Sequence, residues 1–510
     1  MENLLLAFKS VFCWDVLLII GVACVYGIFC GSMPGISATL AVALMVPVTF
    51  YLPPVAAFAA IASTMAMAIF AGDIPGALMR IPGVPSSAAY CDEAYAMTLK
   101  GEGEKSLAIS LVVSVIGGVI GVIALSVSTT VLAEFALKFQ YYEYFWLAAM
   151  GLTTAALICS GQPVKGLISA CIGLVLSTVG YDMVSGHPRF TFGTIALMEG
   201  IHFICALIGV FAVGEVCRQL THGNQQKAID LKIGGGLFIG TLGIALKYKW
   251  QILRGSIIGI IIGALPGSGS DIAAWVSYGV SKKFSKEPEK YGTGHPEGIV
   301  AAAASNNAST CTTWVPSLTF GIPGDSVTAI VIGVLYLKGL EPGPMIFLQR
   351  APLVYSIFIS FFLANLLMLP VGYVAIKISK RLLRVPINVL MPLVLVFCMV
   401  GSFAINNSLL AILIILVLGI ASFILQENEF PAAPLILGMV MGPIMEENFM
   451  QAMIVANGNL LMFFGRPIAA TLGAVVVLFW LTPVYRFLRG KMRHAGRENS
   501  KSIIKKSTCQ

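Results

Sequence analysis

The sequence GSIIGIIIGALPGSGSD at residues 255–271 interrupts a long apolar run with residues that cannot continue a helix. Pro266 lacks a backbone donor and clashes with the preceding turn, and the Gly and Ser residues at 267–270 permit backbone conformations that larger residues avoid. Within a membrane, such irregular backbone is tolerated only where it lines a cavity or packs inside protein. We therefore predict a broken helix whose ends face a ligand, as is common in secondary transporters.

The composition of the chain predicts that this break lies in a lipid bilayer. Only 11% of the 510 residues are charged and 57% are hydrophobic, whereas soluble domains have about 25% charged residues. Residues 106–133 and 385–426 contain no Lys, Arg, Asp or Glu, and roughly 20 apolar residues span a bilayer. Several apolar segments are too short to cross. We expect an all-α polytopic membrane protein with about 12 transmembrane helices plus re-entrant or broken helices.

The distribution of charged, Cys and His residues argues against nucleic-acid binding, disulfides and a metal site. The segment after residue 485 is rich in Lys and Arg, which predicts a cytoplasmic C-terminus rather than a nucleic-acid-binding arm. The eleven Cys residues show no paired spacing, and His187, His202 and His295 lie far apart in the sequence. We therefore expect no disulfides, no metal-binding cluster and no cofactor.

Three motifs occur in the same order in both halves of the chain. They are Gly27-x3-Gly31-x2-Pro34-Gly35, Ile81-Pro82-Gly83 and Leu99-Lys100-Gly101, matched by Gly259-x3-Gly263-x2-Pro266-Gly267, Ile322-Pro323-Gly324 and Leu337-Lys338-Gly339. Duplicated halves with interrupted helices at matching positions are typical of transporters. Basic residues flank only the second break on both sides, which favours opposite orientations of the halves. We predict inverted repeats at 1–218 and 235–485, a cytoplasmic connector at 219–234 and a basic tail at 486–510.

Polar residues at the breaks and at the Ile-Pro-Gly segments are the candidates for binding substrate or ion. They are Pro34, Gly35, Ser37, Pro82, Gly83, Ser86, Ser87, Pro266, Gly267, Ser268, Gly269, Ser270, Asp271, Asn306, Asn307, Pro323, Gly324, Asp325 and Ser326. Backbone N–H groups and amides can hold a carboxylate, while amide and hydroxyl oxygens can hold a coupling sodium ion, expected near Asn306 and Asn307. Alternatively, Asn and Ser bond only across helices, and Asp271 and Asp325 only cap them.

Ionisable residues near the first Ile-Pro-Gly segment are further candidates, because charged groups within a membrane are usually functional. They include Asp73, Arg80, Asp92 and Glu93. Arg80 can neutralise a substrate carboxylate or lie in a loop without a binding role. A channel, which would need a continuous polar pore, and an intramembrane enzyme are the other function classes. The sequence contains no nucleotide-binding loop and no hydrolase motif, so we expect no enzyme activity.

The motif-bearing segments resemble those of the large membrane subunit of tripartite tricarboxylate transporters. The matching segments are GIFCGSMPGISATLAVALMVPVTF (27–50), RIPGVPSSAAYCDEAYAMTLKGEGEKSL (80–107), GIIIGALPGSGSDIAAWVSYGVSKKFSK (259–286), GTGHPEGIVAAAASNNAST (292–310), VPSLTFGIPGDSVTAIVIG (315–333), LKGLEPGP (337–344) and PLILGMVMGPIMEENF (434–449). The chain departs from the pattern of the resembled family in three places. Ala303 stands where Glu is usual, Glu93 stands where Gly is usual, and the first break reads PGISAT rather than a version richer in Gly.

The resemblance implies a symporter of the bacterial inner membrane that is driven by a sodium or proton gradient. It also implies two partners, a small membrane subunit and a periplasmic protein that delivers an organic carboxylate. A homodimer is compatible with this interpretation. The loss of an acidic group at position 303 leaves the choice of ion and carboxylate open.

Overall fold

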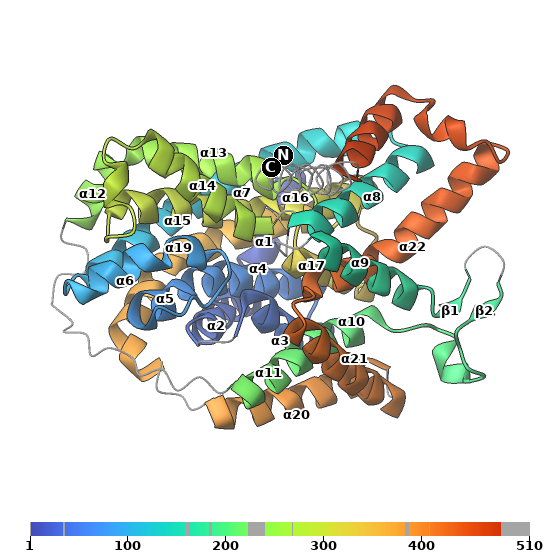
Figure 1. Ribbon diagram of the computed structural model, residues 1–510, viewed down its shortest axis with the longest axis horizontal. Coiled ribbons are helices and arrows are strands. Elements are labelled where there is room, and N and C mark those ends of the chain that lie inside the picture. The colour runs from blue at the N-terminus through green and yellow to red at the C-terminus, as the bar shows by residue number, and fades with distance from the viewer. Residues whose placement is uncertain are drawn as a thin grey trace, which may run out of the picture.

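The computed structural model describes residues 2–33, 36–158, 163–182, 186–222, 240–267, 269–382, 387–406 and 408–480. Helices make up almost all of this part of the chain, which confirms the predicted all-α class (Figure 1). The described strands form one short antiparallel pair, β1 (Gly180–Tyr181) with β2 (Pro188–Arg189). Of the predicted elements, Pro34, Gly35, Ser268, residues 223–234 of the connector and the basic tail lie outside the described residues.

The α-helices are α1 (Glu2–Val11), α2 (Trp14–Gly31), α3 (Ala38–Phe50), α4 (Pro54–Ala71), α5 (Asp73–Met79), α6 (Cys91–Leu99), α7 (Gly103–Ala136), α8 (Tyr141–Ile158), α9 (Pro163–Ser177), α10 (Phe203–Leu207), α11 (Gly214–His222), α12 (Thr241–Lys247), α13 (Lys249–Gly263), α14 (Gly269–Phe284), α15 (Pro296–Thr312), α16 (Trp314–Phe320), α17 (Ser326–Leu337), α18 (Met345–Gln349), α19 (Ala351–Leu382), α20 (Ile387–Asn406), α21 (Leu409–Glu427) and α22 (Ala432–Val455). A π-helical turn at Ile208–Val213 joins α10 to α11.

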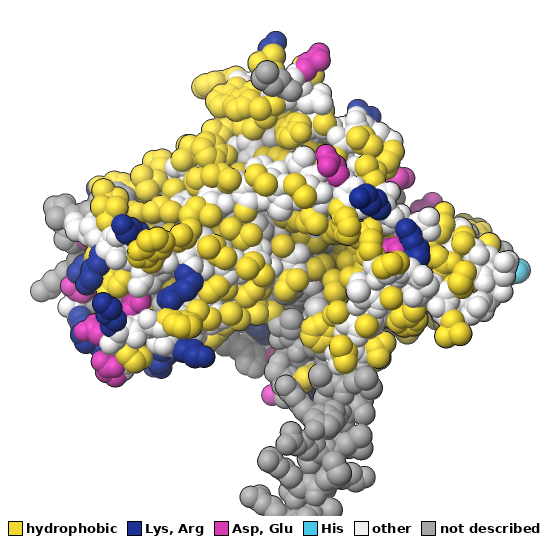
Figure 2. Space-filling model, turned by 90° about the horizontal axis from the view of Figure 1, so that it is seen from above, with side chains coloured by type: hydrophobic (Ala, Val, Ile, Leu, Met, Phe, Trp, Pro, Cys, Tyr) yellow, Lys and Arg dark blue, Asp and Glu magenta, His cyan; other side chains and the backbone are white. Residues whose placement is uncertain are grey.

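The length and composition of the helices fit a multi-pass membrane protein. Within the described residues, six helical stretches are long and apolar enough to cross a bilayer: Trp14–Gly31, Pro54–Met79, Gly103–Ala136, Phe203–Thr221, Ala351–Ser379 and Leu409–Glu427. Shorter apolar helices, such as Ala38–Phe50 and Ser326–Leu337, accompany them. One face of α21 exposes Leu409, Leu413, Val417, Ile420 and Ile424 at helical spacing. Figure 2 shows that hydrophobic side chains cover the middle of one side of the molecule, as expected for a lipid-facing surface.

The repeated Gly-x3-Gly motif allows two pairs of helices to pack at backbone contact. A Cβ added at Gly27 or Gly31 of α2 would lie 2.6 or 2.4 Å from backbone oxygens of α4. Gly259 of α13 approaches α15 in the same way, because its added Cβ would lie 2.3 Å from the carbonyl oxygen of Ser305. Small residues permit such close approach between membrane helices. The same sequence motif therefore forms the same helix–helix contact in each half.

The kinked helices of the two halves, α4–α5 and α15–α16, form the centre of the fold. Each is followed by an Ile-Pro-Gly segment, after a residue with positive φ, Arg80 (58°) or Gly321 (70°). The long helix α7 packs on α15 and the long helix α19 packs on α4, so each half covers the kinked helix of the other. Both halves thus contribute to each of the two large hydrophobic clusters of the described residues. Their predicted boundaries and inverted orientation remain predictions.

Candidate functional site

The starts of four helices meet at a cavity of about 460 Å³ between the two halves. The helices are α3, α14, α17 and α22. The described lining residues are Ser37, Ala38, Thr39, Ile69, Val84, Pro85, Phe211, Gly267, Gly269, Ser270, Asp271, Ile272, Trp275, Asp325, Ser326, Val327, Pro431, Ala432, Ala433 and Leu437. None of these is Lys, Arg or His. Within the described lining, the positive ends of dipoles are therefore those of helix N-termini, whose first backbone N–H groups lack partners within the helix.

The second break and the second Ile-Pro-Gly segment cross at this cavity and are tied together by backbone hydrogen bonds. The amide of Gly267 donates to the carbonyl of Pro323 at 3.2 Å, and the amide of Gly269 donates to the carbonyl of Gly324 at 3.1 Å. Gly267 has a φ of +74°, and a Cβ there would lie 2.5 Å from the carbonyl oxygen of Gly151. Only glycine fits that position without strain. The two Pro-Gly pairs in the sequence, at 266–267 and 323–324, thus mark the point where the two segments cross.

Two carboxylates, Asp271 and Asp325, line the cavity. Asp325 is the N-cap of α17, where its Oδ1 accepts from the amide of Thr328 at 2.7 Å and the Thr328 hydroxyl bonds back in a capping box. The capping role proposed from the sequence is therefore present, at a residue that also faces the cavity. Asp271 lies in the first turn of α14, and the backbone amide of Ser86 approaches its carboxylate. A residue of the first half thus faces a carboxylate of the second.

The first half contributes the start of α3 and the loop after its own Ile-Pro-Gly segment. Ser37 caps α3 by accepting from the amide of Leu40 at 3.1 Å. Val84 and Pro85 line the cavity, while the preceding Gly83 donates its amide to the carbonyl of Gly72 at 3.0 Å. Among the predicted residues, Pro82, Gly83 and Ser87 therefore support the lining without being part of it. Ser86 is buried, and its hydroxyl has no partner among the described residues.

Three other sequence candidates lie outside the cavity lining. Arg80 points to solvent and pairs with Asp92 at 2.8 Å, with both side chains more than 60% exposed. Asn307 is buried in α15 and donates to the hydroxyl of Ser114 on α7 at 2.7 Å, which is the cross-helix bond of the alternative interpretation. Asn306 is also fully buried, and neither polar atom of its side chain has a hydrogen-bond partner in the described part of the chain.

Comparison with known proteins identifies the family of the chain. The sequence model of the Tripartite tricarboxylate transporter TctA family matches residues 17–437. The chain belongs to this family. A protein of Agrobacterium vitis described as an uncharacterized 52.8 kDa protein in the TAR-I ttuC' 3' region is 34% identical over 469 residues, which are 91% of this chain and 93% of the relative. A second A. vitis protein, from the TAR-II ttuC' 3' region, is 35% identical over 237 residues, 46% of this chain and 98% of the relative. No solved structure matches the chain.

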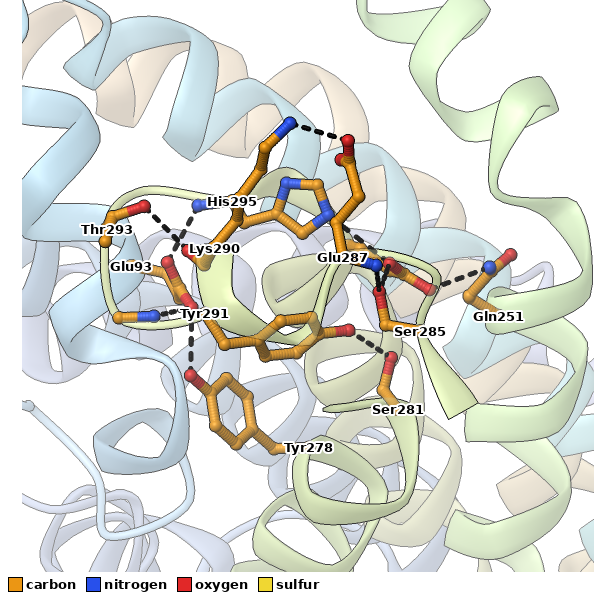
Figure 3. Close-up of polar contacts among 12 residues, drawn as sticks. Glu93, Gln251, Tyr278, Ser281, Ser285, Glu287, Lys290, Tyr291, Thr293 and His295 are labelled. Atoms are coloured by element: carbon orange, nitrogen blue, oxygen red, sulfur yellow. Dashed lines mark hydrogen bonds and ion pairs between the residues drawn. The ribbon is translucent and has the colours of Figure 1, made fainter. Parts of the chain in front are cut away.

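This TctA-family chain connects its halves through Glu93, one of the ionisable candidates from the sequence. Figure 3 shows the Glu93 carboxylate of α6 between Tyr278 of α14 and the loop before α15. It accepts from the Tyr278 hydroxyl at 2.9 Å. Backbone amides of Gly292, Gly294 and His295 donate to it at 2.5–2.8 Å. These four hydrogen bonds satisfy a fully buried carboxylate. The acidic side chain therefore has a structural partner at every oxygen.

A second buried carboxylate, Glu297, holds the other side of the same loop. It accepts from Gln251 of α13 at 2.9 Å, from Ser285 at 2.6 Å, and lies 3.3 Å from His295 Nε2. Nearby, burial raises the pKa of Tyr291 to about 12, so its phenol stays neutral. The two carboxylates fix the end of α14. The same helix lines the large cavity at Asp271, seven residues before Tyr278. At a rise of 1.5 Å per residue, these two residues are about 10 Å apart along the helix axis.

Some lining residues gave no recognisable signal in the sequence. Phe211 and Trp275 are apolar residues in apolar surroundings, and the start of α22 at Pro431–Ala433 lies far along the chain from both breaks. An N-terminal Pro before an apolar run does indicate a helix start. It does not indicate which cavity that start faces. Ala303 places a fully buried methyl group in α15, one turn before Asn307.

Proposed function

We propose that the chain is the membrane subunit that carries a small di- or tricarboxylate across the bacterial inner membrane, driven by a sodium or proton gradient. The observation that supports this most directly is the cavity where four helix N-termini meet without a basic side chain in the described lining. A helix N-terminus is equivalent to roughly half a positive charge. Four of them around one cavity favour an anion, and their N–H groups match carboxylate oxygens.

The acidic residues of the cavity make cation coupling chemically necessary for this proposal. Asp271 and Asp325 would repel an anionic substrate if they stayed ionised and unpaired. A sodium ion or a proton that enters with the substrate removes this repulsion. The substrate and the cation then bind cooperatively, since each lowers the electrostatic cost of the other. This cooperativity is what a symporter requires.

Contributions from both halves of the chain make the cavity a natural site for alternating access. Movement of one half against the other would open the cavity to one side of the membrane while closing it to the other. The tripartite system to which the family belongs adds a small membrane subunit and a periplasmic binding protein. We expect the binding protein to deliver the carboxylate and the C-terminal tail to face the cytoplasm. A homodimer is compatible with the large apolar surface.

Uptake by proteoliposomes that contain the full chain and its small membrane subunit tests the proposal. Labelled di- and tricarboxylates are offered with the binding protein, under an inward sodium gradient, an inward proton gradient or neither. We expect accumulation that needs the binding protein and one of the two gradients. Equal flux without any gradient would overturn coupled transport. Ionic currents that are independent of the binding protein would instead indicate a channel.

A further inference from the structure

A second, much smaller cavity lies beside Asp73, at the kink between α4 and α5. Its volume is about 10 Å³, which is room for one water-sized occupant. It is lined by Asp73, Gly76, Ala77, Ser87, Tyr90, Cys91, Ala94, Ser106, Leu107, Ser110 and Ile299. Asp73 is 3% exposed and belongs to the apolar stretch Pro54–Met79. This cavity is separate from the large one, since the two share no lining residue.

The carboxylate of Asp73 is surrounded by hydroxyl groups and has no basic neighbour in the described lining. Its Oδ1 accepts from the Tyr90 hydroxyl at 2.7 Å, and its Oδ2 accepts from the hydroxyl of Ser110. Cys91, which also lines the cavity, donates its thiol to the carbonyl of Gly76 at 3.4 Å. Two neutral hydrogen bonds do not compensate for the transfer of a full charge out of water. The site therefore lacks one positive charge.

Oxygen atoms without hydrogen-bond partners complete the site. Ser106 lines the cavity, is 1% exposed, and its hydroxyl has no partner among the described residues. The carboxamide of Asn306 lies near the Tyr90 hydroxyl and is likewise buried without a partner of good geometry. Buried polar groups are normally satisfied, so an orphaned pair beside an unneutralised carboxylate indicates a missing ligand. Apart from the sulfur of Cys91, whose thiol is bonded to the carbonyl of Gly76, the polar side-chain atoms of the described lining are oxygens, which suit a hard cation.

We infer that this cavity binds a sodium ion, held by the carboxylate of Asp73 and the hydroxyl oxygens of Ser106, Ser110 and Tyr90. The hydroxyls of Tyr90 and Ser110 can each turn a lone pair to the ion while their hydrogens still point to the carboxylate. The Ser106 hydroxyl has no such bond to keep. A single carboxylate matches one positive charge. Calcium sites use more oxygen ligands and usually several carboxylates, and the cavity holds only one. A proton on Asp73 would neutralise the charge but would leave the Ser106 hydroxyl without a partner.

The sodium site is connected to the large cavity by one short loop, which gives it a role in the proposed transport function. The carbonyl of Gly72, next to Asp73, accepts from the amide of Gly83 at 3.0 Å and from the hydroxyl of Ser87 at 3.3 Å. Val84 and Pro85, between these two residues, line the large cavity. An ion that fixes the kink therefore also fixes this part of the substrate site. If transport is as proposed above, sodium binding here prepares the substrate cavity.

Thermal unfolding of the purified full chain in detergent tests the site without substrate or partners. Sodium chloride is titrated against choline chloride at constant ionic strength and pH. We expect the melting temperature of the wild type to rise with sodium and that of Asp73→Asn to show no sodium-dependent rise. Asp92→Asn is the matched control, because Asp92 is exposed and pairs only with Arg80 among the described residues. It should keep the full sodium response.

A second, milder variant keeps the test valid if Asp73→Asn does not fold. Ser106→Ala removes a hydroxyl that makes no hydrogen bond within the described chain, so the protein should fold normally. The sodium concentration for half-maximal stabilisation should rise about tenfold, the equivalent of 1.4 kcal/mol. An unchanged sodium response in Ser106→Ala and Asp73→Asn, or stabilisation by acid without any effect of sodium, would overturn the inference. Gradient-driven uptake without stabilisation by sodium would reject this site and leave the proposed function standing. Stabilisation by sodium without gradient-driven uptake would support the site and reject the proposed function.

Discussion

The two kinked helices, α4–α5 and α15–α16, have the same backbone design and different chemistry. In each, a seven-residue helix follows the kink, Asp73–Met79 or Trp314–Phe320. The residue after the Ile at 81 or 322 is Pro, and the amide of that Ile donates to the carbonyl of Pro75 or Pro316 at 3.3–3.4 Å. The third residue, Gly83 or Gly324, packs on the kink itself. The backbone therefore forms the same turn after the kinked helix in both halves.

The side chains at the kinks differ completely. Asp73 begins α5 in a pocket of hydroxyl groups, whereas Trp314 begins α16 in an apolar contact with Phe361 and donates its indole N–H to Met65 Sδ at 3.3 Å. After the Ile-Pro-Gly segments the pattern is reversed, with apolar Val84 in the first half and Asp325 in the second. The duplicated backbone thus keeps its turns and glycines, while each half carries a different polar site.

The largest expected effect comes from the glycines that the halves share. Gly83→Ala would bring its Cβ to 2.6 Å from Gly72 Cα, and Gly324→Ala to 2.5 Å from the carbonyl oxygen of Thr313. Since both contacts are with backbone, we expect each variant to lose about 3 kcal/mol or more of folding stability. The melting temperature of the purified protein measures this loss. Equal losses in both variants would support the shared backbone design.

Glycines with open space around them are the controls for this comparison. A Cβ at Gly21 of α2 or Gly279 of α14 meets no atom within 4 Å. We expect Gly21→Ala and Gly279→Ala to unfold at or slightly above the wild-type temperature, because Ala favours helix over Gly by up to about 1 kcal/mol. A strong loss in only one of Gly83→Ala and Gly324→Ala would show that the halves do not use the turn in the same way.

A smaller effect is expected from Asp271→Asn, a substitution that removes the charge of this residue but keeps an oxygen that can accept a hydrogen bond. Asp271→Asn keeps an oxygen for the amide of Ser86 but removes the negative charge that, in the proposed function, requires a cation. We expect uptake in proteoliposomes to fall at least about tenfold, which corresponds to about 1.4 kcal/mol, with an unchanged melting temperature. Asp92→Asn, at the exposed pair with Arg80, should transport normally. Normal uptake by Asp271→Asn would remove this carboxylate from the coupling mechanism.

The sequence predicts the backbone of this site better than its side-chain environment. Pro-Gly pairs at 266–267 and 323–324 locate the crossing because glycine and proline constrain the chain locally. The surroundings of the Asp73 side chain could not be predicted in the same way. Its hydroxyl neighbours are Tyr90, in the turn before α6, and Ser110, in α7, and only tertiary packing brings them together. Glu93 likewise finds three of its four donors in a loop about 200 residues away, and the fourth is Tyr278 of α14.

The smallest expected effect concerns helix capping, where Asp325 of α17 and Ser37 of α3 have the same local role. Removal of either side chain in Asp325→Ala or Ser37→Ala frees a helical amide, that of Thr328 or Leu40, at a cost of about 1 kcal/mol. Asp325→Asn should stay within about 0.5 kcal/mol of the wild type, since Asn and Asp cap about equally well. Thermal unfolding distinguishes these outcomes. If Asp325→Asn were as unstable as Asp325→Ala, the charge of Asp325 would matter to the fold beyond capping. The negative charge would then need a fixed positive partner in the resting cavity.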